Sequence, residues 1–551
     1  MNVLIVVPRY AGPGKFYNWP IGLASIYAFL KRNGFLVSCL NLCHETVDDT
    51  GTSLKNAFKR QTIDVVCTGG MAMHSKKIED IFTNAKLIRP EVITVAGGPI
   101  VTADPEMALR HLPIDFGVIG EGEYAMVELL EALRNGSSPD SVKGLAFIRN
   151  KGEFVFTGAR KEISDLDSLP MPEYEDFGFK QWMTTIKYAK QMTILENIRD
   201  VRYAEMIGSR SCPFSCTFCY HPLGKVYRKR SIEHIFKEID FLVNTYGVNV
   251  IAFGDELFSA NNEQMLQFAE RIRPYNLKYL VQLRVNNIQQ EVLEKLVESG
   301  AMYATFGIES MSDRVLKSMK KQTTRSEIIN ALALARKARL YCSGNIILGD
   351  PADTLETITE SISWVQENPS YNISLGFVVA VPDAPIYRYA LEQGIIKDKW
   401  AHVRNNLPLV NLTKISNWKY YNLLLKVQYW NFMHSNNTAG VLVSSKKLEE
   451  QFEGKHFYML EMRCPFCGCE QKLKTFMGYS TPNVLIVCVK CFASFKISQN
   501  NAFYDDYSLF STARYLFFKM ANVILLRFSF GRTYLGVLRD LAKRCSRGMS
   551  W

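Results

Sequence analysis

Three cysteines stand in a C-x3-C-x2-C pattern, at Cys212, Cys216 and Cys219. A loop with this spacing can turn three thiolates toward one centre, and soft sulfur ligands favour iron–sulfur centres. Three thiolates suit three corners of a [4Fe-4S] cluster, which leaves the fourth iron free to bind a small molecule. Zinc is the rival metal, but a structural zinc site takes four ligands. No fourth cysteine lies nearby, although His221 does. Three unrelated buried cysteines are a weaker interpretation, because all three fall within one short stretch.

A second cysteine group has the pattern C-x2-C…C-x2-C, at Cys464, Cys467, Cys488 and Cys491. This spacing is a strong signal for a zinc ribbon, whose four thiolates hold one Zn²⁺. The aliphatic and aromatic residues around the cysteines predict the short strands of such a ribbon, and Cys469 is a spare thiol. Rubredoxin-like iron or a second iron–sulfur cluster is the alternative. A closed zinc site is structural, so we assign it no chemistry.

Around the first cysteine group, apolar runs alternate with helical patterns. Strands are predicted at 203–208, 249–254, 278–283, 301–307, 341–348 and 372–380. In a barrel of parallel strands the chemistry takes place at the carboxyl ends. Polar residues and a glycine follow those ends here, namely Asp255, Glu256, Arg284, Asn286, Glu309, Ser310 and Gly349. Carboxylates at such a place can accept hydrogen bonds from a protonated amine. For Glu309 a structural salt bridge is the alternative, but its position directly after a buried strand favours function.

The first 135 residues show the same alternation. Strands are predicted at 3–7, 36–42, 63–68, 91–96 and 115–119, and helices near 21–33, 74–88, 105–111 and 123–134. This spacing predicts a parallel sheet covered by helices on both faces. Ligands of such sheets bind at the carboxyl ends of the strands.

The loops at those carboxyl ends are rich in glycine, which lets backbone approach a large ligand closely. The candidate binding residues are Pro8, Arg9, Tyr10, Gly22, Thr68, Gly69, Gly70, Met71, Gly97, Gly98, Pro99, Gly120, Glu121 and Gly122. Any one of these loops alone would be an ordinary turn. Four of them at one sheet edge favour a ligand site.

The whole chain of 551 residues is long enough for three or four domains. Hydrophobic residues make up 47% and charged residues 22%, as in globular proteins. Eight of the thirteen cysteines, Cys469 included, fall in the two metal-like stretches 212–219 and 464–491, which predicts a reducing cytoplasm rather than disulfides. Residues 1–7 predict a buried strand and not a signal peptide. No run of about 18 apolar residues predicts a transmembrane helix.

The net charge of +11 is compatible with nucleic acid, anionic lipid or anionic substrates. No helix-turn-helix or RNA-binding signature is present, so no nucleic-acid partner is expected. Residues 512–551 hold one acid, Asp540, and eight basic residues, namely Arg514, Lys519, Arg527, Arg532, Arg539, Lys543, Arg544 and Arg547. A basic amphipathic helix can lie on an anionic membrane surface or pack on the protein. We therefore expect a cytoplasmic protein, with peripheral contact at the inner membrane face as a hypothesis.

The stretch Ser209–Tyr220, with Phe218 before the last cysteine, resembles the cluster loop of the radical SAM enzymes. Asp255-Glu256, Gly307-Ile308-Glu309-Ser310 and Gly349-Asp350-Pro351 follow in the order of that family's motifs, over residues 200–395. The resemblance implies a partial (β/α)6 TIM barrel and a [4Fe-4S] cluster whose open iron chelates S-adenosylmethionine (SAM). Reductive cleavage of SAM, with electrons from an external donor such as flavodoxin or ferredoxin, would give a 5′-deoxyadenosyl radical. The implied SAM contacts are Phe218, Asp255, Glu256, Arg284, Asn286, Glu309, Ser310 and Gly349.

Residues 1–140 resemble the cobalamin-binding domain that precedes one radical SAM subclass. The resemblance rests on Pro20-Ile21-Gly22-Leu23, Gly97-Gly98-Pro99 and Gly120-Glu121-Gly122-Glu123. It implies that the glycine-rich edge binds cobalamin. The Asp-x-His-x-x-Gly motif, which supplies a histidine to cobalt in other cobalamin proteins, is absent from the chain, and neither His44 nor His74 stands in that context. Cobalamin would therefore bind without a histidine ligand. A nucleotide-binding or vestigial Rossmann-like domain is the alternative.

We therefore predict an α/β protein with a Rossmann-like domain, a partial barrel and a C-terminal extension with a zinc ribbon. The predicted parts are a cobalamin-binding domain (1–140), a hairpin and linker (141–199), a radical SAM barrel (200–395), a helical extension (396–455), a ribbon (456–500) and a basic tail (501–551). Aromatic residues between 414 and 435 predict core packing, or a wall over the barrel mouth.

The resemblances imply a cobalamin-dependent radical SAM enzyme. The favoured reaction is methyl transfer to an unactivated carbon of a small-molecule or lipid-like substrate. The first alternative is radical oxidation, cyclisation or rearrangement without methyl transfer. The second is an iron–sulfur or cobalamin sensor, against which the intact Asp-Glu and Gly-Ile-Glu-Ser turns argue.

Overall fold

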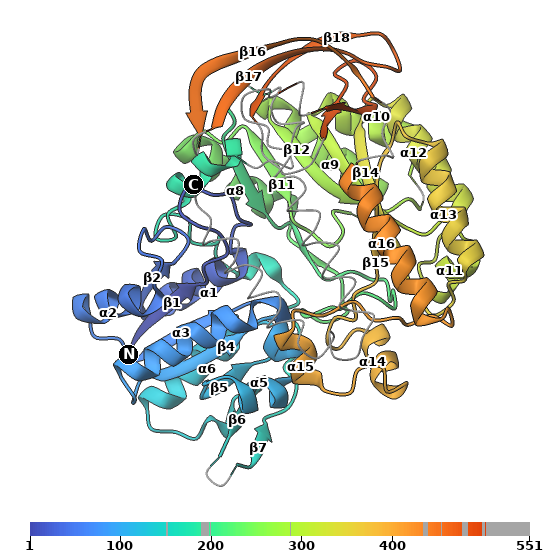
Figure 1. Ribbon diagram of the computed structural model, residues 1–551. Coiled ribbons are helices and arrows are strands. Elements are labelled where there is room, and N and C mark those ends of the chain that lie inside the picture. The colour runs from blue at the N-terminus through green and yellow to red at the C-terminus, as the bar shows by residue number, and fades with distance from the viewer. Residues whose placement is uncertain are drawn as a thin grey trace.

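The computed structural model describes residues 1–502 except 150–151, 189–197, 199, 260, 287, 434–438, 453–454, 477–482 and 499–501. Two α/β domains lie side by side, and a β-rich module covers the far end of the second (Figure 1). The basic tail predicted at 512–551 lies outside the described residues, so its membrane contact stays a prediction. Within the described residues, no helix combines the length and apolarity that crossing a bilayer requires.

The first domain is built on a seven-stranded sheet with the strand order β2-β1-β3-β4-β5-β6-β7. Its strands are β1 (Asn2–Val7), β2 (Leu36–Asn41), β3 (Val65–Gly69), β4 (Ile93–Gly97), β5 (Phe116–Val118), β6 (Leu145–Ile148) and β7 (Phe154–Phe156). The first five are parallel, as predicted, and the β6–β7 hairpin continues the sheet antiparallel to β5. The expected boundary at residue 140 therefore falls inside this sheet, because the hairpin pairs with β5 instead of standing apart.

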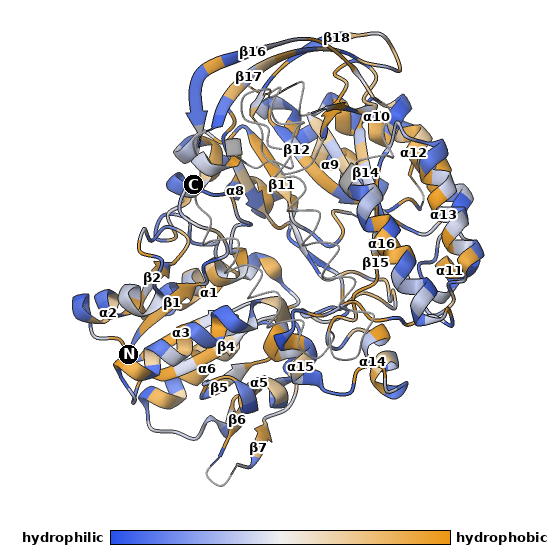
Figure 2. Ribbon diagram, in the orientation of Figure 1, coloured by the Kyte–Doolittle hydropathy of each residue, from blue (hydrophilic) through white to orange (hydrophobic). Residues whose placement is uncertain are grey.

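Helices cover both faces of this sheet. They are α1 (Ile21–Arg32), α2 (Thr50–Arg60), α3 (Ser75–Ile88), α4 (Pro99–Ala103), α5 (Pro105–His111) and α6 (Glu123–Arg134). Successive side chains of β1 alternate between two cores: Ile5 packs with α1 and α6, and Leu4 packs with α2 and α3. Figure 2 shows apolar strands between helices that are polar on their outer sides. Helix α2 escaped prediction, and α4 is too short to show a helical period.

An aromatic cluster joins the first domain to the second through the linker. Trp19 stacks on Tyr174 at 6.2 Å between ring centroids, and Trp182 of α7 (Phe179–Met183) donates its indole N–H to Tyr17 O at 2.7 Å. Tyr203, on the first strand of the second domain, lies 5.9 Å from Trp182. These rings belong to one continuous hydrophobic core, so the two domains share apolar packing.

The second domain is an open six-stranded parallel sheet with the order β15-β14-β13-β12-β11-β8. Its strands are β8 (Tyr203–Met206), β11 (Val250–Phe253), β12 (Lys278–Leu283), β13 (Ala301–Glu309), β14 (Tyr341–Leu348) and β15 (Asn372–Phe377). The helices that follow them are α8 (Ile232–Tyr246), α9 (Asn262–Ile272), α10 (Gln290–Glu298), α11 (Asp313–Ser318), α12 (Arg325–Lys337) and α13 (Leu355–Glu367). All six strands were predicted, because each apolar run is followed by a helix that buries it.

Three helices continue the chain: α14 (Pro385–Glu392), α15 (Lys399–Arg404) and α16 (Asn417–Met433). Helix α15 packs on α3 and α5 of the first domain, and α16 runs along β15. Tyr420 and Tyr421 of α16 are fully buried, whereas Trp418 is exposed, so the aromatic segment contributes core packing.

The C-terminal module contains β16 (Val441–Phe452), β17 (Lys455–Arg463), β18 (Glu470–Phe476), β19 (Asn483–Val487) and β20 (Ser494–Ser498). The first three form an antiparallel sheet that arches over the upper end of the barrel in Figure 1. The prediction of a helical extension up to 455 was wrong for Val441–Phe452. This segment is a strand because β17 supplies it with a backbone hydrogen-bonding partner along most of its length.

Candidate site at the domain boundary

The cysteine loop is closed at its base by a two-stranded hairpin. Strand β9 (Ser209–Arg210) pairs with β10 (Arg228–Lys229), and residues 211–227 form the loop between them. The loop is held at its centre, since Thr217 N donates to Met319 O at 3.0 Å and Ile386 N donates to Thr217 O at 2.9 Å. The cysteine loop is thus fixed by backbone bonds to two other segments of the barrel.

The three thiols of the loop influence one another. Cys216 is buried, and Cys212 and Cys219 are partly buried. Burial raises the pKa of the Cys219 thiol to about 12, and the Glu256 carboxylate and the other two thiols add to the rise. Such thiols ionise when a metal cation takes the place of the proton, because the thiolate is the metal ligand. Three thiols on one loop that influence one another electrostatically fit an iron–sulfur cluster.

The two acids after β11 have different surroundings. Asp255 is 3% exposed and accepts hydrogen bonds from Ser209 Oγ at 2.5 Å and Gly208 N at 3.3 Å. Burial raises the pKa of Asp255 to about 6. The Asp255 carboxylate therefore holds the segment that enters the cysteine loop through these two hydrogen bonds. The sequence predicted Asp255 only as a SAM contact.

Glu256 lies beside the loop with its carboxylate one-third exposed. His221 Nδ1 donates to Glu256 Oε2 at 3.0 Å, because a carboxylate only accepts. The other ring nitrogen, His221 Nε2, is buried and has no partner among the described residues. A buried polar atom without a partner is costly. This orphan nitrogen next to the loop is consistent with a site that a polar ligand completes.

Glu309 and Lys321 form a buried ion pair at the end of β13. Lys321 Nζ donates to Glu309 Oε1 at 2.6 Å, and Glu309 adopts a left-handed backbone with φ of 65°. A Cβ on Gly307 would lie 2.4 Å from Lys321 Nζ, so the glycine makes room for the pair. Ser310 is buried, and its Oγ accepts from Ser312 N at 3.2 Å. The salt bridge considered for Glu309 is therefore present.

Arg284 connects the cysteine loop to this region. Its guanidinium lies 3.5 Å from the ring centroid of Phe214, within the loop, and donates to Asn286 Oδ1 at 3.2 Å and to Lys321 O. Asn286 in turn donates to Gln322 O at 2.8 Å. Phe214 and Lys321 were not predicted as site residues. A phenylalanine between two cysteines, or one lysine of a pair, does not by itself indicate a binding site.

The remaining predicted SAM contacts are a glycine and an aromatic ring. Gly349, after β14, has φ of 97°, and a Cβ there would lie 2.8 Å from the Tyr420 hydroxyl of α16. The Gly349 backbone and the Tyr420 hydroxyl therefore lie close together at the end of β14. Phe218 packs partly buried against the core around α14, so its ring supports the loop.

The predicted residues at the glycine-rich edge of the first domain are of two kinds. Some hold neighbouring loops in place, and others have free space beside them. Thr68 Oγ1 donates to Val6 O at 2.7 Å, and Arg9 donates to Glu45 O and Val47 O, so these side chains hold loops. A Cβ on Gly69 would lie 2.7 Å from Gly97 O, which fixes the close approach of β3 and β4. Pro99 begins α4 directly after Gly98, whose φ is 79°.

The open positions of this edge are two glycines and a methionine. Gly22 and Gly120 have no atom within 4 Å of a Cβ position, and Met71 is 48% exposed. By contrast, a Cβ on Gly70 would meet His74, and one on Gly122 would meet Ile26. Tyr10 donates its backbone N–H to Pro8 O at 2.7 Å, which shapes the first loop, and its hydroxyl donates to Gly69 O at 3.5 Å.

Each of the two histidines near this edge has one ring nitrogen in a hydrogen bond. His44 Nε2 bonds the Tyr17 hydroxyl at 3.0 Å, and a Cβ on Gly178 would lie 2.6 Å from Nδ1. His74 Nδ1 accepts from Met71 N at 3.3 Å, which leaves the ring proton on Nε2. Burial lowers the pKa of each histidine to about 4. With Nδ1 accepting, the neutral His74 ring has no free lone pair for cobalt, and the hydrogen bond of His44 Nε2 holds that ring against Tyr17.

The facing edges of the two domains are fastened together. Glu121, predicted to contact cobalamin, directs its carboxylate to the barrel instead and accepts from Arg210 and Arg228, which flank the cysteine loop, at 2.6 Å each. On the other side of the boundary, Lys399 Nζ lies 2.9 Å from Asp104 Oδ2. The strand ends of both domains therefore meet at one boundary.

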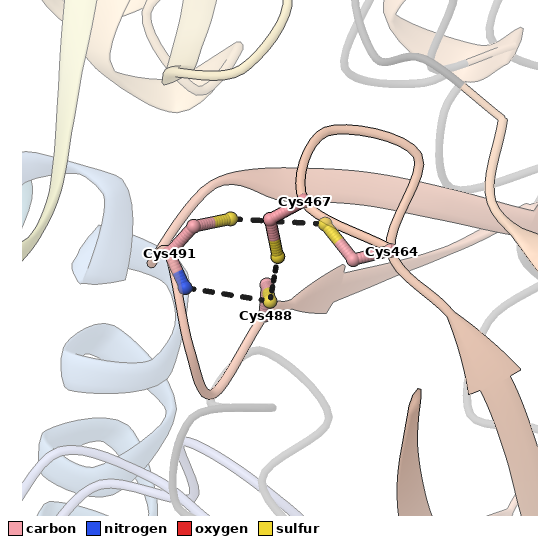
Figure 3. A group of neighbouring side chains, drawn as sticks. All are labelled: Cys464, Cys467, Cys488 and Cys491. Atoms are coloured by element: carbon pink, nitrogen blue, oxygen red, sulfur yellow. Dashed lines mark hydrogen bonds between the residues drawn. The ribbon is translucent and has the colours of Figure 1, made fainter. Parts of the chain in front are cut away.

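The four cysteines of the C-terminal module form a compact group (Figure 3). Their sulfur atoms lie within 4.8 Å of one another, with Cys464 Sγ 3.7 Å from Cys491 Sγ and Cys467 Sγ 3.6 Å from Cys488 Sγ. Tetrahedral zinc with Zn–S bonds of ~2.3 Å requires sulfur–sulfur distances of ~3.8 Å. The donor set thus fits one zinc ion, with Cys469 outside the group.

This module sits at the opposite end of the barrel from the cysteine loop. Ser494 N, at the start of β20, donates to Ser370 O at 3.0 Å, and Ser370 precedes β15. The contact is therefore at the amino ends of the barrel strands, whereas barrel chemistry takes place at the carboxyl ends. The four cysteines therefore lie away from the edge at which the barrel carries its cysteine loop.

Comparisons with known proteins agree with this architecture. The family model "Radical SAM superfamily" matches residues 206–365, and the model "B12 binding domain" matches residues 13–130. An uncharacterized methyltransferase of Pyrococcus horikoshii, PH0819, is 28% identical over 77% of this chain and 91% of its own length. An anaerobic magnesium-protoporphyrin IX monomethyl ester cyclase of Cereibacter sphaeroides is 27% identical over 66% of this chain and 60% of its own length.

Among solved structures, the radical S-adenosylmethionine methyltransferase TsrM from Kitasatospora setae, with cobalamin and a [4Fe-4S] cluster bound, has a similar fold. The TM-score is 0.58 at 17% identity, over 71% of this chain and 79% of TsrM. The order of the two matched domains, the cysteine loop and the shared fold lead to one conclusion. The chain belongs to the radical SAM superfamily and carries a B12-binding domain in front of its radical SAM domain.

Proposed function

We propose that this protein is a cobalamin-dependent radical SAM methyltransferase that methylates an unactivated carbon of a small molecule. The observation that carries the proposal is the boundary at which Glu121 of the first domain bonds both arginines that flank the cysteine loop. This contact supports an arrangement in which the cobalamin edge lies next to the cluster. The alignment with a protein named as a methyltransferase, over 91% of that protein, supports methyl transfer.

In this proposal Cys212, Cys216 and Cys219 hold the [4Fe-4S] cluster. When bound, the cluster supplies an electron to SAM, and cobalamin supplies a carrier for the methyl group. Glu256 accepts the ammonium group of SAM, and His221 keeps the carboxylate oriented through its 3.0 Å bond.

Further residues give the SAM pocket its charge and shape. Arg284, stacked on Phe214, offers a cation to the SAM carboxylate beside the loop. Asn286, Glu309 and Ser310 provide polar groups at neighbouring strand ends, and Gly349 lets backbone approach the adenine. The glycines at 22 and 120 let the first domain approach the corrin ring closely.

The cysteine group of the C-terminal module holds one structural zinc in this proposal. An external one-electron donor such as flavodoxin or ferredoxin reduces the cluster, because no described residue is a reductant of that kind. The basic tail attaches the enzyme to anionic lipid, on the strength of its eight basic residues. Flotation with anionic vesicles at low salt, compared with a chain ending at residue 511, tests the attachment.

The experiment that tests the function is anaerobic turnover with SAM labelled at its methyl group, on candidate small molecules. Label on a carbon of the product, together with 5′-deoxyadenosine and S-adenosylhomocysteine, is the expected result. 5′-Deoxyadenosine with an oxidised or cyclised product that carries no label would assign the protein to a reaction of the cyclase type instead.

A further inference from the structure

A buried network of four charges joins the B12-binding domain to both strands of the hairpin at the base of the cysteine loop. Arg210 of β9 donates to Glu121 Oε1 at 2.6 Å and to Glu123 Oε1 at 2.5 Å. Arg228 of β10 donates to Glu121 Oε2 at 2.6 Å. The two carboxylates come from one turn of the first domain, and the two guanidinium groups come from the two sides of the loop.

The four side chains of this network are withdrawn from water. The side chains of Glu121, Glu123 and Arg228 are 4–5% exposed, and that of Arg210 is 15% exposed. Two buried acids face two bases, and the short distances are those of charge-assisted hydrogen bonds. A third acid, Glu162, lies 3.8 Å from Arg228 Nε with its side chain 27% exposed. Removing one partner would leave a buried charge uncompensated, so each member of the network depends on the others.

Arg228 also fixes the segment that returns from the cysteine loop to β10. Its remaining donors reach Leu223 O at 2.7 Å, Val226 O at 3.0 Å and Ile163 O at 2.9 Å. Glu121 itself accepts a further bond from Ile163 N at 2.6 Å. A movement of the Glu121 carboxylate would therefore be transmitted to the loop through Arg210 on one side and Arg228 on the other.

The residue before Glu121 faces the predicted cobalamin edge. Gly120 has φ of 74°, its N–H donates to Thr102 Oγ1 at 2.9 Å, and the position of its missing Cβ is open for 4 Å. Adjacent residues of one turn thus meet the open edge and the cysteine loop. A ligand that contacts the backbone at Gly120 acts on a turn whose next side chain holds the loop.

We propose that Glu121 is a positioning residue that couples occupancy of the cobalamin site to the geometry of the cysteine loop and hence to SAM binding. The inference rests on the proposed function, since it needs both cofactors. Binding equilibria that are coupled must be reciprocal: cobalamin changes the affinity for SAM by the same factor by which SAM changes the affinity for cobalamin.

The test uses the full chain with its cluster reconstituted anaerobically. The dissociation constant of hydroxocobalamin is measured by its visible absorption, with and without SAM, and the spectrum of the reduced cluster is recorded with and without cobalamin. In the unaltered protein we expect the two constants to differ by about fivefold or more, the lower range of measured couplings. In Glu121→Gln we expect both ligands to bind. The ratio of the hydroxocobalamin dissociation constants measured without and with SAM should then fall toward one.

The matched control is Glu128→Gln. Glu128 lies on α6 of the same domain and pairs with Arg160 in a more exposed ion pair away from the loop, so this variant should keep the coupling. Arg210→Lys, which keeps the charge but loses the fork that spans both acids, should lower the coupling and gives a second variant should Glu121→Gln fail to fold.

Two results would overturn the inference. One is equal hydroxocobalamin affinity with and without SAM in the unaltered protein. The other is an unchanged ratio in Glu121→Gln or Arg210→Lys. Neither result depends on methyl transfer, so coupling without methylated product would contradict the proposed function and leave this inference standing.

Discussion

Lys321 Nζ lies 2.6 Å from Glu309 Oε1, in an ion pair whose side chains are at most 10% exposed. The pair depends on three backbone features: the left-handed conformation of Glu309, the left-handed residues Lys320 and Gln322 on either side of Lys321, and the absence of a side chain on Gly307. Since Arg284 also donates to the carbonyl of Lys321, this lysine links β13 to the cation beside the cysteine loop.

Lys321→Met should strongly destabilise the protein. Removing one partner of a buried pair leaves Glu309 with an uncompensated charge, at a cost of about 3–5 kcal/mol. Denaturation of the cluster-loaded protein followed by circular dichroism measures the loss. Lys295→Met is the control, because the Lys295–Glu298 pair is half exposed and should contribute less than about 1 kcal/mol. Equal losses in the two variants would show that the Lys321 pair is unimportant.

Stability should depend on pH through Glu205, whose Oε2 accepts from Trp19 N at 2.8 Å across the domain boundary. Burial raises the pKa of Glu205 from 4.5 to about 7. Below pH 4.5 the carboxyl is protonated whether the chain is folded or not, and stability is unaffected. As pH rises to 7 only the unfolded chain ionises, so the folded state loses up to about 3 kcal/mol.

Glu205→Gln cannot ionise and keeps an acceptor for Trp19 N. The variant should therefore melt at a higher temperature than the unaltered protein at pH 8, and the difference should shrink toward pH 5. Glu91→Gln, at a carboxylate that is 76% exposed, should show no such pH dependence. A Glu205→Gln difference that is the same at both pH values would disprove the assignment.

Cobalamin should bind without a protein histidine on cobalt, because His74 Nδ1 accepts from Met71 N, which leaves Nε2 protonated, and His44 Nε2 bonds the Tyr17 hydroxyl. The electron paramagnetic resonance spectrum of the cob(II)alamin-loaded chain should show no nitrogen splitting from a protein histidine. A splitting that disappears in His74→Ala would contradict this, since it would identify His74 as a ligand.

The C-terminal cysteine group should contain one zinc per chain by metal analysis. Replacing Cys464 and Cys488 with serine should remove the zinc and make the module sensitive to protease, because metal binding and local folding are coupled. Formation of 5′-deoxyadenosine should persist, since the module contacts the amino ends of the barrel strands. Cys469→Ser is the control and should keep its zinc. Iron in place of zinc would support the rubredoxin-like alternative.

The sequence predicted the parallel strands of both sheets well, because each is an apolar run followed by a helix that must cover it. It failed at β16 (Val441–Phe452), whose strand conformation depends on pairing with β17 and not on a period of its own. It placed the cysteines on one loop, since their spacing is local. Features that a local pattern of residues determines were therefore predicted, and a strand that depends on pairing with another segment was not.

Side-chain roles at the site were harder to predict, because they depend on partners remote in sequence. Glu121 was expected at the cobalamin edge, but its partner Arg228 lies 107 residues away. Asp255 was expected at SAM, but it braces Ser209 from another strand. Lys321 belongs to a pair of lysines that looks like protein surface, and only the left-handed turn around it buries the side chain.

The central claim is that one chain brings a cluster on Cys212, Cys216 and Cys219 close to cobalamin at the domain boundary. Electron paramagnetic resonance of the anaerobically reduced chain, loaded with both cofactors, tests it most directly. The account predicts signals of a reduced [4Fe-4S] cluster and cob(II)alamin that are broadened or split by mutual magnetic interaction. It also predicts that alanine at all three cysteines abolishes the cluster signal and the interaction but leaves cobalamin bound. Two superimposed, non-interacting spectra, or a full cluster in the triple variant, would contradict it.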